Sequence, residues 1–266
     1  MSETVVILGV GEGFGLSIAR AFGQVGKHPI LVARNEEKLR KMAAALHDEN
    51  IAATPISADA TNPQQTERMF KQVVEKFGVP ETFIYNVGNT SPDDPFTTPI
   101  EQIKRTFDMN VLGAITTIRQ FINLTTDFEK KRNVLITGGG AALHPNEYTA
   151  TLSLTKAALR SFVFSLQKAV KGKNIYIGLI TIQGISDLNE AMQPQNVAKV
   201  YLKAVDKQQD KEIFYPGETE NEKSEIEQLE DIAKDKQRVS RLLQKHPEIL
   251  AFIKQHPELK NKIDAC

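Results

Sequence analysis

Thr4-Val-Val-Ile-Leu-Gly9-Val-Gly11-Glu-Gly13-Phe-Gly15 contains the apolar run and the glycine loop that decide the fold. The run predicts a strand, and the apolar residues that follow the loop at helical spacing predict a helix. A glycine loop in this context lets backbone amides approach a pyrophosphate at the positive end of the helix. We therefore expect a dinucleotide to bind here, through Gly9, Gly11, Gly13, Phe14 and Gly15. Taken without its context, the loop is also compatible with an ordinary turn.

Short apolar runs alternate with helical patterns along most of the chain. Strands are predicted at residues 4–9, 29–33, 51–58, 82–86, 133–137, 175–182 and 212–215. Helices are predicted at residues 14–25, 35–49, 63–77, 99–124, 152–170 and 194–206, the fourth opened by a capping box from Thr98 to Glu101. Alternating helices and continuous apolar strands indicate an α/β fold with a doubly wound parallel sheet, the Rossmann fold.

The character of the sequence changes after Gly217. Residues 218–235 are mostly acidic and residues 236–262 mostly basic, with apolar residues at helical spacing. We therefore expect two parts: a dinucleotide-binding domain over residues 1–217 and a charged helical extension over residues 218–266.

Composition narrows the class of protein. The formal net charge is zero, which gives no reason to expect nucleic acid as a partner. Cys266 is the one cysteine, so neither an intrachain disulfide nor a cysteine-based metal site is expected, which fits a reducing cytoplasm. No apolar stretch approaches the length of a membrane span, and neither a metal nor a membrane partner is predicted.

A second motif lies far from the glycine loop. Leu152-Ser-Leu-Thr-Lys156-Ala-Ala-Leu159 resembles the Tyr-x-x-x-Lys segment of short-chain dehydrogenases/reductases, and Gly9, Gly13 and Gly15 have the glycine spacing of that family. The resemblance extends from residue 3 to about residue 217. It implies an oxidoreductase linked to NAD(P)(H), in which Lys156 binds the nicotinamide ribose and belongs to the catalytic group.

The resemblance implies roles for several more residues. Asp59-Ala60 matches the segment that contacts adenine, and Asn86-Val-Gly88 resembles the end of the family's Asn-Asn-Ala-Gly motif, with Tyr85 at its first asparagine. Asn110 matches the asparagine that supports a proton-relay water. Gly184 follows Gln183 where the family has Pro-Gly, and it completes the predicted cofactor site.

The sequence also departs from the family. Leu152 occupies the position of the catalytic tyrosine, and Gly139 occupies the position of the catalytic serine, thirteen residues earlier. Leucine has no proton to give. Nine residues separate Gly184 from Pro194, fewer than most members use as a lid over the substrate, and Leu188 stands where a threonine often contacts the carboxamide.

The end of the second predicted strand bears on cofactor choice. NAD-selective relatives usually have an acidic residue there, whereas this chain has Ala33 followed by Arg34, which can pair with a ribose 2′-phosphate. Glu12 opposes that preference, and Arg34 is alternatively a solvated residue at a helix start. We expect NADP, with NAD possible.

A substitute for the missing tyrosine is Tyr148, eight positions before Lys156, although a surface loop is the ordinary interpretation of that segment. The sequence thus predicts a short-chain dehydrogenase/reductase with a divergent site, of unknown substrate, that lacks the usual serine and tyrosine. The alternative is a non-catalytic NADP(H)-binding sensor or regulatory protein that acts through a partner. Family members commonly associate through the helices that correspond to residues 99–124 and 152–170, so we expect a homodimer or homotetramer. We expect it in the cytoplasm, in line with the single cysteine.

Overall fold

The computed structural model describes residues 3–126, 129–186, 189–209, 211–217, 239–240 and 243–244. Its centre is a seven-stranded parallel sheet in the order β3-β2-β1-β4-β5-β6-β7. The strands are β1 (Thr4–Leu8), β2 (His28–Ala33), β3 (Thr54–Ser57), β4 (Thr82–Tyr85), β5 (Arg132–Thr137), β6 (Ile175–Ile182) and β7 (Glu212–Tyr215). The predicted doubly wound α/β fold is confirmed.

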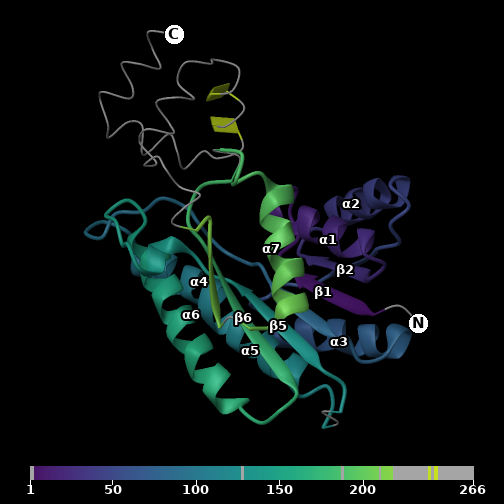
Figure 1. Ribbon diagram of the computed structural model, residues 1–266. Coiled ribbons are helices and arrows are strands. Elements are labelled where there is room, and N and C mark those ends of the chain that lie inside the picture. Colours follow the sequence, from purple (N-terminus) through teal and green to yellow (C-terminus); the bar gives the residue numbers. More distant parts are fainter. Residues whose placement is uncertain are drawn as a thin grey trace.

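Helices cover both faces of the sheet (Figure 1). They are α1 (Phe14–Gln24), α2 (Glu36–Asp48), α3 (Pro63–Phe77), α4 (Ile100–Phe107), α5 (Gly113–Ile122), α6 (Ala150–Ala169) and α7 (Pro194–Lys207), with a π-helical turn η1 (Asp108–Leu112) and a 3₁₀ turn η2 (Gly140–Ala142). Among the described residues, no helix is long and apolar enough to span a membrane.

Each face of the sheet has its own hydrophobic core because successive strand residues point to opposite faces. Val6 and Leu8 of β1 pack with residues of α3, α5 and α6, whereas Val5 and Ile7 pack with residues of α1, α2 and α7. All five residues of β1 are buried, as expected for an interior strand of a sheet covered on both sides.

The strand order reverses beside β1. The chain passes from β1 to β2 and β3 on one side and then returns to β4 on the other side. Leu8 pairs with Val32 of β2 and with Tyr85 of β4, and Tyr85 pairs with Ile136 of β5, so the carboxyl ends of these strands lie level. Ligands of doubly wound proteins bind in the crevice at such a switch point.

The fourth predicted helix differs from the expectation. The predicted capping box is wrong: α4 begins after Pro99 without a side-chain cap, and the Thr98 hydroxyl instead accepts a hydrogen bond from the Asp94 amide. Helical structure runs without a gap from Ile100 to Ile122, as predicted to within a few residues, but it contains the π-helical turn η1 between α4 and α5. The predicted extension at residues 218–266 lies outside the described residues except for residues 239–240 and 243–244, as does Leu188.

Candidate functional site

The glycine loop forms a tight connection between β1 and α1. Gly9 has φ +99°, and a Cβ there would lie 2.6 Å from the carbonyl carbon of Asn86. A Cβ on Gly15 would lie 2.7 Å from Cα of Val10. Gly11 and Gly13 have no atom within 4 Å of a Cβ position, so their backbone faces open space. Two glycines therefore permit the turn, and the other two leave room for a ligand at the start of α1.

Asn86 links the end of β4 to this loop. Its backbone amide donates to the Leu8 carbonyl at 2.8 Å, and its side-chain amide donates to the Gly9 carbonyl at 3.0 Å. The Thr137 hydroxyl donates to Asn86 Oδ1 at 2.9 Å and lies 2.7 Å from the Tyr201 hydroxyl. Because Thr137 has one hydroxyl proton, Tyr201 is the donor in the second bond. This chain of bonds connects α7 to the glycine loop across β5 and β4.

Lys156 lies at the carboxyl end of β5. Its side chain is 6% exposed, and its Nζ donates to the Thr137 carbonyl at 2.8 Å. Burial lowers the pKa of Lys156 to about 8. A Cβ on Gly88 would lie 3.7 Å from Nζ, and a Cβ on Gly139 would lie 3.6 Å from Cγ of the lysine. The predicted residues Gly88 and Lys156 are therefore brought together, with Gly139 along the lysine side chain.

Asn110 sits in η1 and is fully buried. Its Oδ1 accepts from the Asn89 amide at 2.8 Å, and its Nδ2 donates to the Thr155 hydroxyl at 2.9 Å. The Tyr85 hydroxyl donates to the carbonyl of Met109, the preceding residue, at 2.5 Å. Asn110 thus joins η1 to the loop after β4 and to α6, one residue from Lys156.

A cavity of about 300 Å³ lies between the glycine loop and the end of β2. Its lining residues are Val10, Gly11, Glu12, Ala33, Asn35, Lys38 and Met42. Asn35 caps α2, and its Oδ1 accepts from the Lys38 amide at 3.0 Å. Arg34, the predicted phosphate ligand, is exposed. It lies in sequence between Ala33 and Asn35, which line the cavity, but it is not itself a lining residue.

The other predicted cofactor residues follow β3 and β6 or begin α1. Oδ1 of Asp59 accepts from the Thr61 amide and hydroxyl, both at 2.8 Å, and Ala60 is buried. Gly184 follows β6, where a Cβ would lie 3.1 Å from Cγ of Met192. Phe14 is the first residue of α1 and packs against the core on that face.

Tyr148 is held in the loop before α6. Its amide donates to Asn146 Oδ1 at 3.0 Å, and its carbonyl accepts from the Asp93 amide at 2.9 Å. A side-chain hydrogen bond to Glu147 raises the pKa of Tyr148. The hydroxyl is thus directed to an exposed carboxylate.

Comparison with known proteins decides the family. The profile described as short chain dehydrogenase matches residues 3–197. The chain belongs to the short-chain dehydrogenase family. An uncharacterized oxidoreductase of Staphylococcus aureus is 25% identical over 76% of this chain and 90% of its own length. The 3-dehydrosphinganine reductase of Danio rerio is 28% identical over 75% of this chain and 67% of its own.

Solved structures share the fold of this short-chain dehydrogenase. A variant of actinorhodin polyketide ketoreductase with NADPH superposes with a TM-score of 0.76 at 18% identity, covering 83% of this chain and 98% of that one. An alcohol dehydrogenase of the archaeon Thermococcus sibiricus, complexed with 5-hydroxy-NADP, gives 0.71 at 20% identity, covering 80% and 96%.

Sequence reasoning missed three residues at the site of this dehydrogenase. Thr137 and Tyr201 are 64 positions apart, and only the folded sheet brings their hydroxyls together. The position of Lys38 could have been predicted from nearby residues. Asn35 followed by Glu36 and Glu37 is typical of a helix start, and this places Lys38 in the first turn of α2. The roles of the predicted site residues stay predictions.

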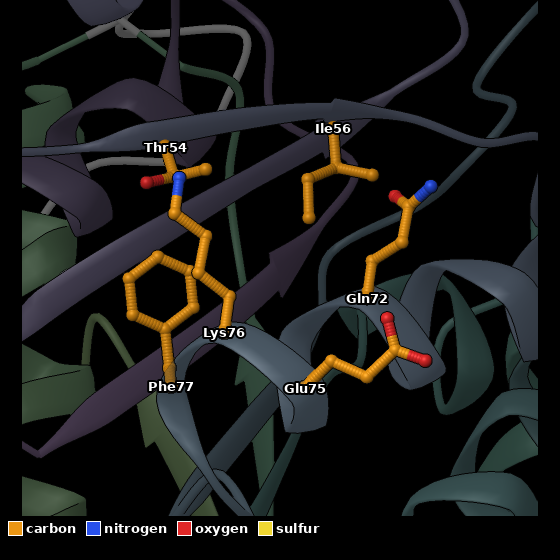
Figure 2. Close-up of a pocket in the computed structure, with 6 residues that line it drawn as sticks. All are labelled: Thr54, Ile56, Gln72, Glu75, Lys76 and Phe77. Carbon is orange, nitrogen blue, oxygen red and sulfur yellow. The ribbon is translucent and has the colours of Figure 1, made fainter.

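A second cavity, of about 370 Å³, lies at the β3 edge of the dehydrogenase sheet, and Figure 2 shows the residues that line it. It is lined by residues of β3 and of the last turns of α3: Thr54, Ile56, Gln72, Glu75, Lys76 and Phe77. Thr54 begins β3, so this cavity is at the amino end of that strand, away from the glycine loop. The loop, Lys156 and the cavity beside Lys38 therefore define the candidate site.

Proposed function

We propose that this chain is an NADP(H)-linked oxidoreductase that transfers a hydride between the cofactor and an organic substrate. The observation that supports this most strongly is the link between the glycine loop and buried Lys156, through Asn86 and Thr137, at the switch point of a short-chain dehydrogenase sheet. A bound nicotinamide cofactor supplies the hydride. Gly13 and the start of α1 are suited to the pyrophosphate, and the Lys156 ammonium is suited to ribose hydroxyls.

NADP is favoured over NAD by the charges near the end of β2. Lys38 lines the cavity there and Arg34 immediately follows the strand, so two cations are placed to attract a 2′-phosphate. Glu12 lines the same cavity and opposes them. Two structural neighbours were solved with NADPH or 5-hydroxy-NADP, which agrees with this preference.

The proton chemistry of the site differs from that of the family. Gly139 and Leu152 stand at the positions of the serine and the tyrosine, and neither side chain can stabilise a developing alkoxide. Loss of a general acid typically costs about 10²–10⁴ in rate. Lys156 and Asn110 remain, and Tyr148 is the predicted substitute acid. We therefore expect slow reduction of ordinary ketones.

Titration calorimetry with NADPH and NADH tests the cofactor assignment. Arg34→Asp and Lys38→Glu should each weaken NADPH binding by about tenfold, because a charge-assisted hydrogen bond is worth roughly 1.5–3 kcal/mol. Arg34→Asp should also bring NADH to at least equal affinity. Lys41→Glu is the matched control, since Lys41 is on the exposed side of α2 and pairs with Glu37. Equal affinities of the wild type for both cofactors contradict the assignment.

The alternative of a non-catalytic NADP(H) sensor predicts binding without turnover of any substrate. The matching relatives are oxidoreductases or reductases by name, which favours the enzyme. A turnover screen against aldehydes, ketones and enones, followed by oxidation of NADPH, separates the two. The cytoplasmic location and the homo-oligomer remain predictions.

A further inference from the structure

The Lys156 ammonium is a buried charge with few partners. It is 6% exposed and donates one hydrogen bond, to the Thr137 carbonyl at 2.8 Å. In the part of the chain that the structure describes, no carboxylate lies within 4.0 Å of its Nζ. The lowering of its pKa has burial as its cause, without a contribution from a charged neighbour. An ammonium has three donors, so two N–H groups remain to be used by a ligand.

The hydroxyl groups closest to Lys156 in α6 are already committed. Ser153 Oγ donates to the Thr149 carbonyl at 3.0 Å, and Thr155 Oγ1 donates to the Leu152 carbonyl at 3.1 Å. Leu152, at the position of the family's tyrosine, is four residues before Lys156, so the helix places both on one face, and Leu152 has no hydroxyl. Neither hydroxyl has a proton left for a substrate, because each has only one to donate.

Glycines flank the lysine on two sides. Cβ atoms on Gly88 and Gly139 would lie 3.6–3.7 Å from the lysine side chain, so the backbone passes beside it without a side chain between. The described part of the site therefore has a lone cation that can stabilise an anion, and it lacks the serine and tyrosine hydroxyls of the family at Gly139 and Leu152.

Resting on the proposed function, we propose that the substrate is a quinone, a hydride acceptor whose reduced form is a resonance-stabilised oxyanion. The C–H bond at C4 of the nicotinamide breaks and its hydrogen and electron pair pass to one quinone oxygen, so that an O–H bond forms, NADPH becomes NADP⁺, and the other oxygen becomes the phenolate of the hydroquinone monoanion beside the Lys156 ammonium. A proton from solvent then completes the hydroquinone. The balance is quinone, NADPH and one proton giving hydroquinone and NADP⁺.

The difference in basicity of the products favours this class of substrate. A phenol has a pKa of about 10, whereas a simple alcohol, like water, is a far weaker acid. A phenolate therefore persists until water protonates it. The alkoxide from a simple ketone needs a proton in the transition state, and the serine and tyrosine that serve this step in the family are replaced here by Gly139 and Leu152.

Oxidation of NADPH in the presence of menadione or α-tetralone tests the inference, because the two have fused rings of similar size. The full-length wild type should turn over menadione at least about 100-fold faster than α-tetralone, the lower range of a lost general acid. Equal rates overturn the quinone inference but leave the oxidoreductase proposal standing. Turnover of neither compound, with NADPH bound in a calorimetric titration, overturns both.

Variants separate the role of the cation from that of the missing acid. Lys156→Met should abolish most menadione reduction, whereas Lys156→Arg should retain part of it, because Arg keeps the charge. The matched control is Lys168→Met, an exposed lysine of the same helix, which should match the wild type. A Lys156→Met protein that is folded by circular dichroism and reduces menadione normally overturns the inference.

A gain-of-function variant that keeps Lys156 tests the inference even if the protein does not fold without this lysine. Gly139→Ser has room, because its Cβ would make ordinary contacts of 3.6–3.7 Å with the lysine. Combined with Leu152→Tyr, it should raise the rate with α-tetralone about 10-fold or more and leave the menadione rate nearly unchanged. A parallel increase with both substrates overturns the inference.

Discussion

At the residue scale, Lys156 combines a charge with nearly complete burial. Burial lowers its pKa to about 8 from an ordinary value of 10.5. Below about pH 8 both the folded and the unfolded chain are protonated here, and the folded chain bears the full desolvation cost. As the pH rises to 10.5, the unfolded chain retains a proton that the folded chain has lost, so this cost is relieved.

The free energy of unfolding of the wild type, measured relative to Lys156→Met, should therefore rise with pH. A pKa lowered by roughly 2–3 corresponds to a gain of about 3 kcal/mol in the free energy of unfolding between about pH 8 and 10.5. Urea unfolding of both proteins at several pH values between about 7 and 10.5 measures it. Other titrating groups are common to the two proteins and largely cancel. A constant difference contradicts the assigned burial of the charge.

The glycine loop provides a matched pair of substitutions. Gly9→Ala should cost about 1–3 kcal/mol of stability, because Gly9 has φ +99° and its Cβ would meet Asn86 backbone at 2.6 Å. Gly13→Ala should leave stability nearly unchanged, since no atom lies within 4 Å of its Cβ position, yet weaken NADPH binding. Urea unfolding and calorimetry measure the two effects. Equal stability of the two variants contradicts this division of roles.

At the element scale, η1 replaces a turn of the continuous helix that the sequence predicted. Periodicity alone does not reveal this π-helical turn, because the bonds that accompany it come from residues distant in sequence. Tyr85 donates to the Met109 carbonyl from 24 positions away, and Asn110 bonds Thr155 from 45 positions away. π-helical turns are frequent at functional sites, and this one places Asn110 beside α6.

Tyr85→Phe tests the bond that supports η1. Burial, with a contribution from Asp59, raises the pKa of Tyr85, so its hydroxyl keeps its proton and remains a donor. Removal leaves the Met109 carbonyl without that donor and should cost about 1–3 kcal/mol. Chemical denaturation measures the loss, and unchanged stability argues against a supporting role for this hydroxyl.

The sequence predicted the strands and most helices because apolar periodicity is a local signal. It predicted the glycine loop, Asn86 and Lys156 through motifs whose residues are adjacent in the chain. It did not predict that Thr137 would join Asn86 to Tyr201, since this requires the packing of α7 on the sheet. Nor did it place Lys38 in the cavity, because the resemblance drew attention to Arg34, at the end of the second strand, as the residue that selects the cofactor.

At the scale of the whole molecule, exposed apolar residues bear on the predicted homo-oligomer. Leu112 of η1 and Leu154 of α6 are 47% and 54% exposed, within the helices predicted to associate. Leu154→Glu should therefore convert a dimer or tetramer into a smaller species, because it places a charge in a buried interface. Light scattering measures the mass of each protein.

Val25→Glu is the control for that experiment. Val25 is 56% exposed but lies at the end of α1, on the other face of the sheet. Its variant should have the mass of the wild type. A monomeric wild type, or equal behaviour of the two variants, contradicts association through η1 and α6.

The central claim is that the crevice at the ends of β1, β4 and β5 binds NADP(H) through the glycine loop and Lys156. Calorimetric titration of the full-length chain with NADPH tests it most directly. The account predicts saturable binding of one molecule per chain, with a Kd of roughly 1 µM to 1 mM, the usual range of enzyme KM values. It also predicts marked weakening in Gly13→Ala and Lys156→Met. A folded wild type that binds no NADPH at millimolar concentration, or variants that bind as the wild type does, would contradict the account.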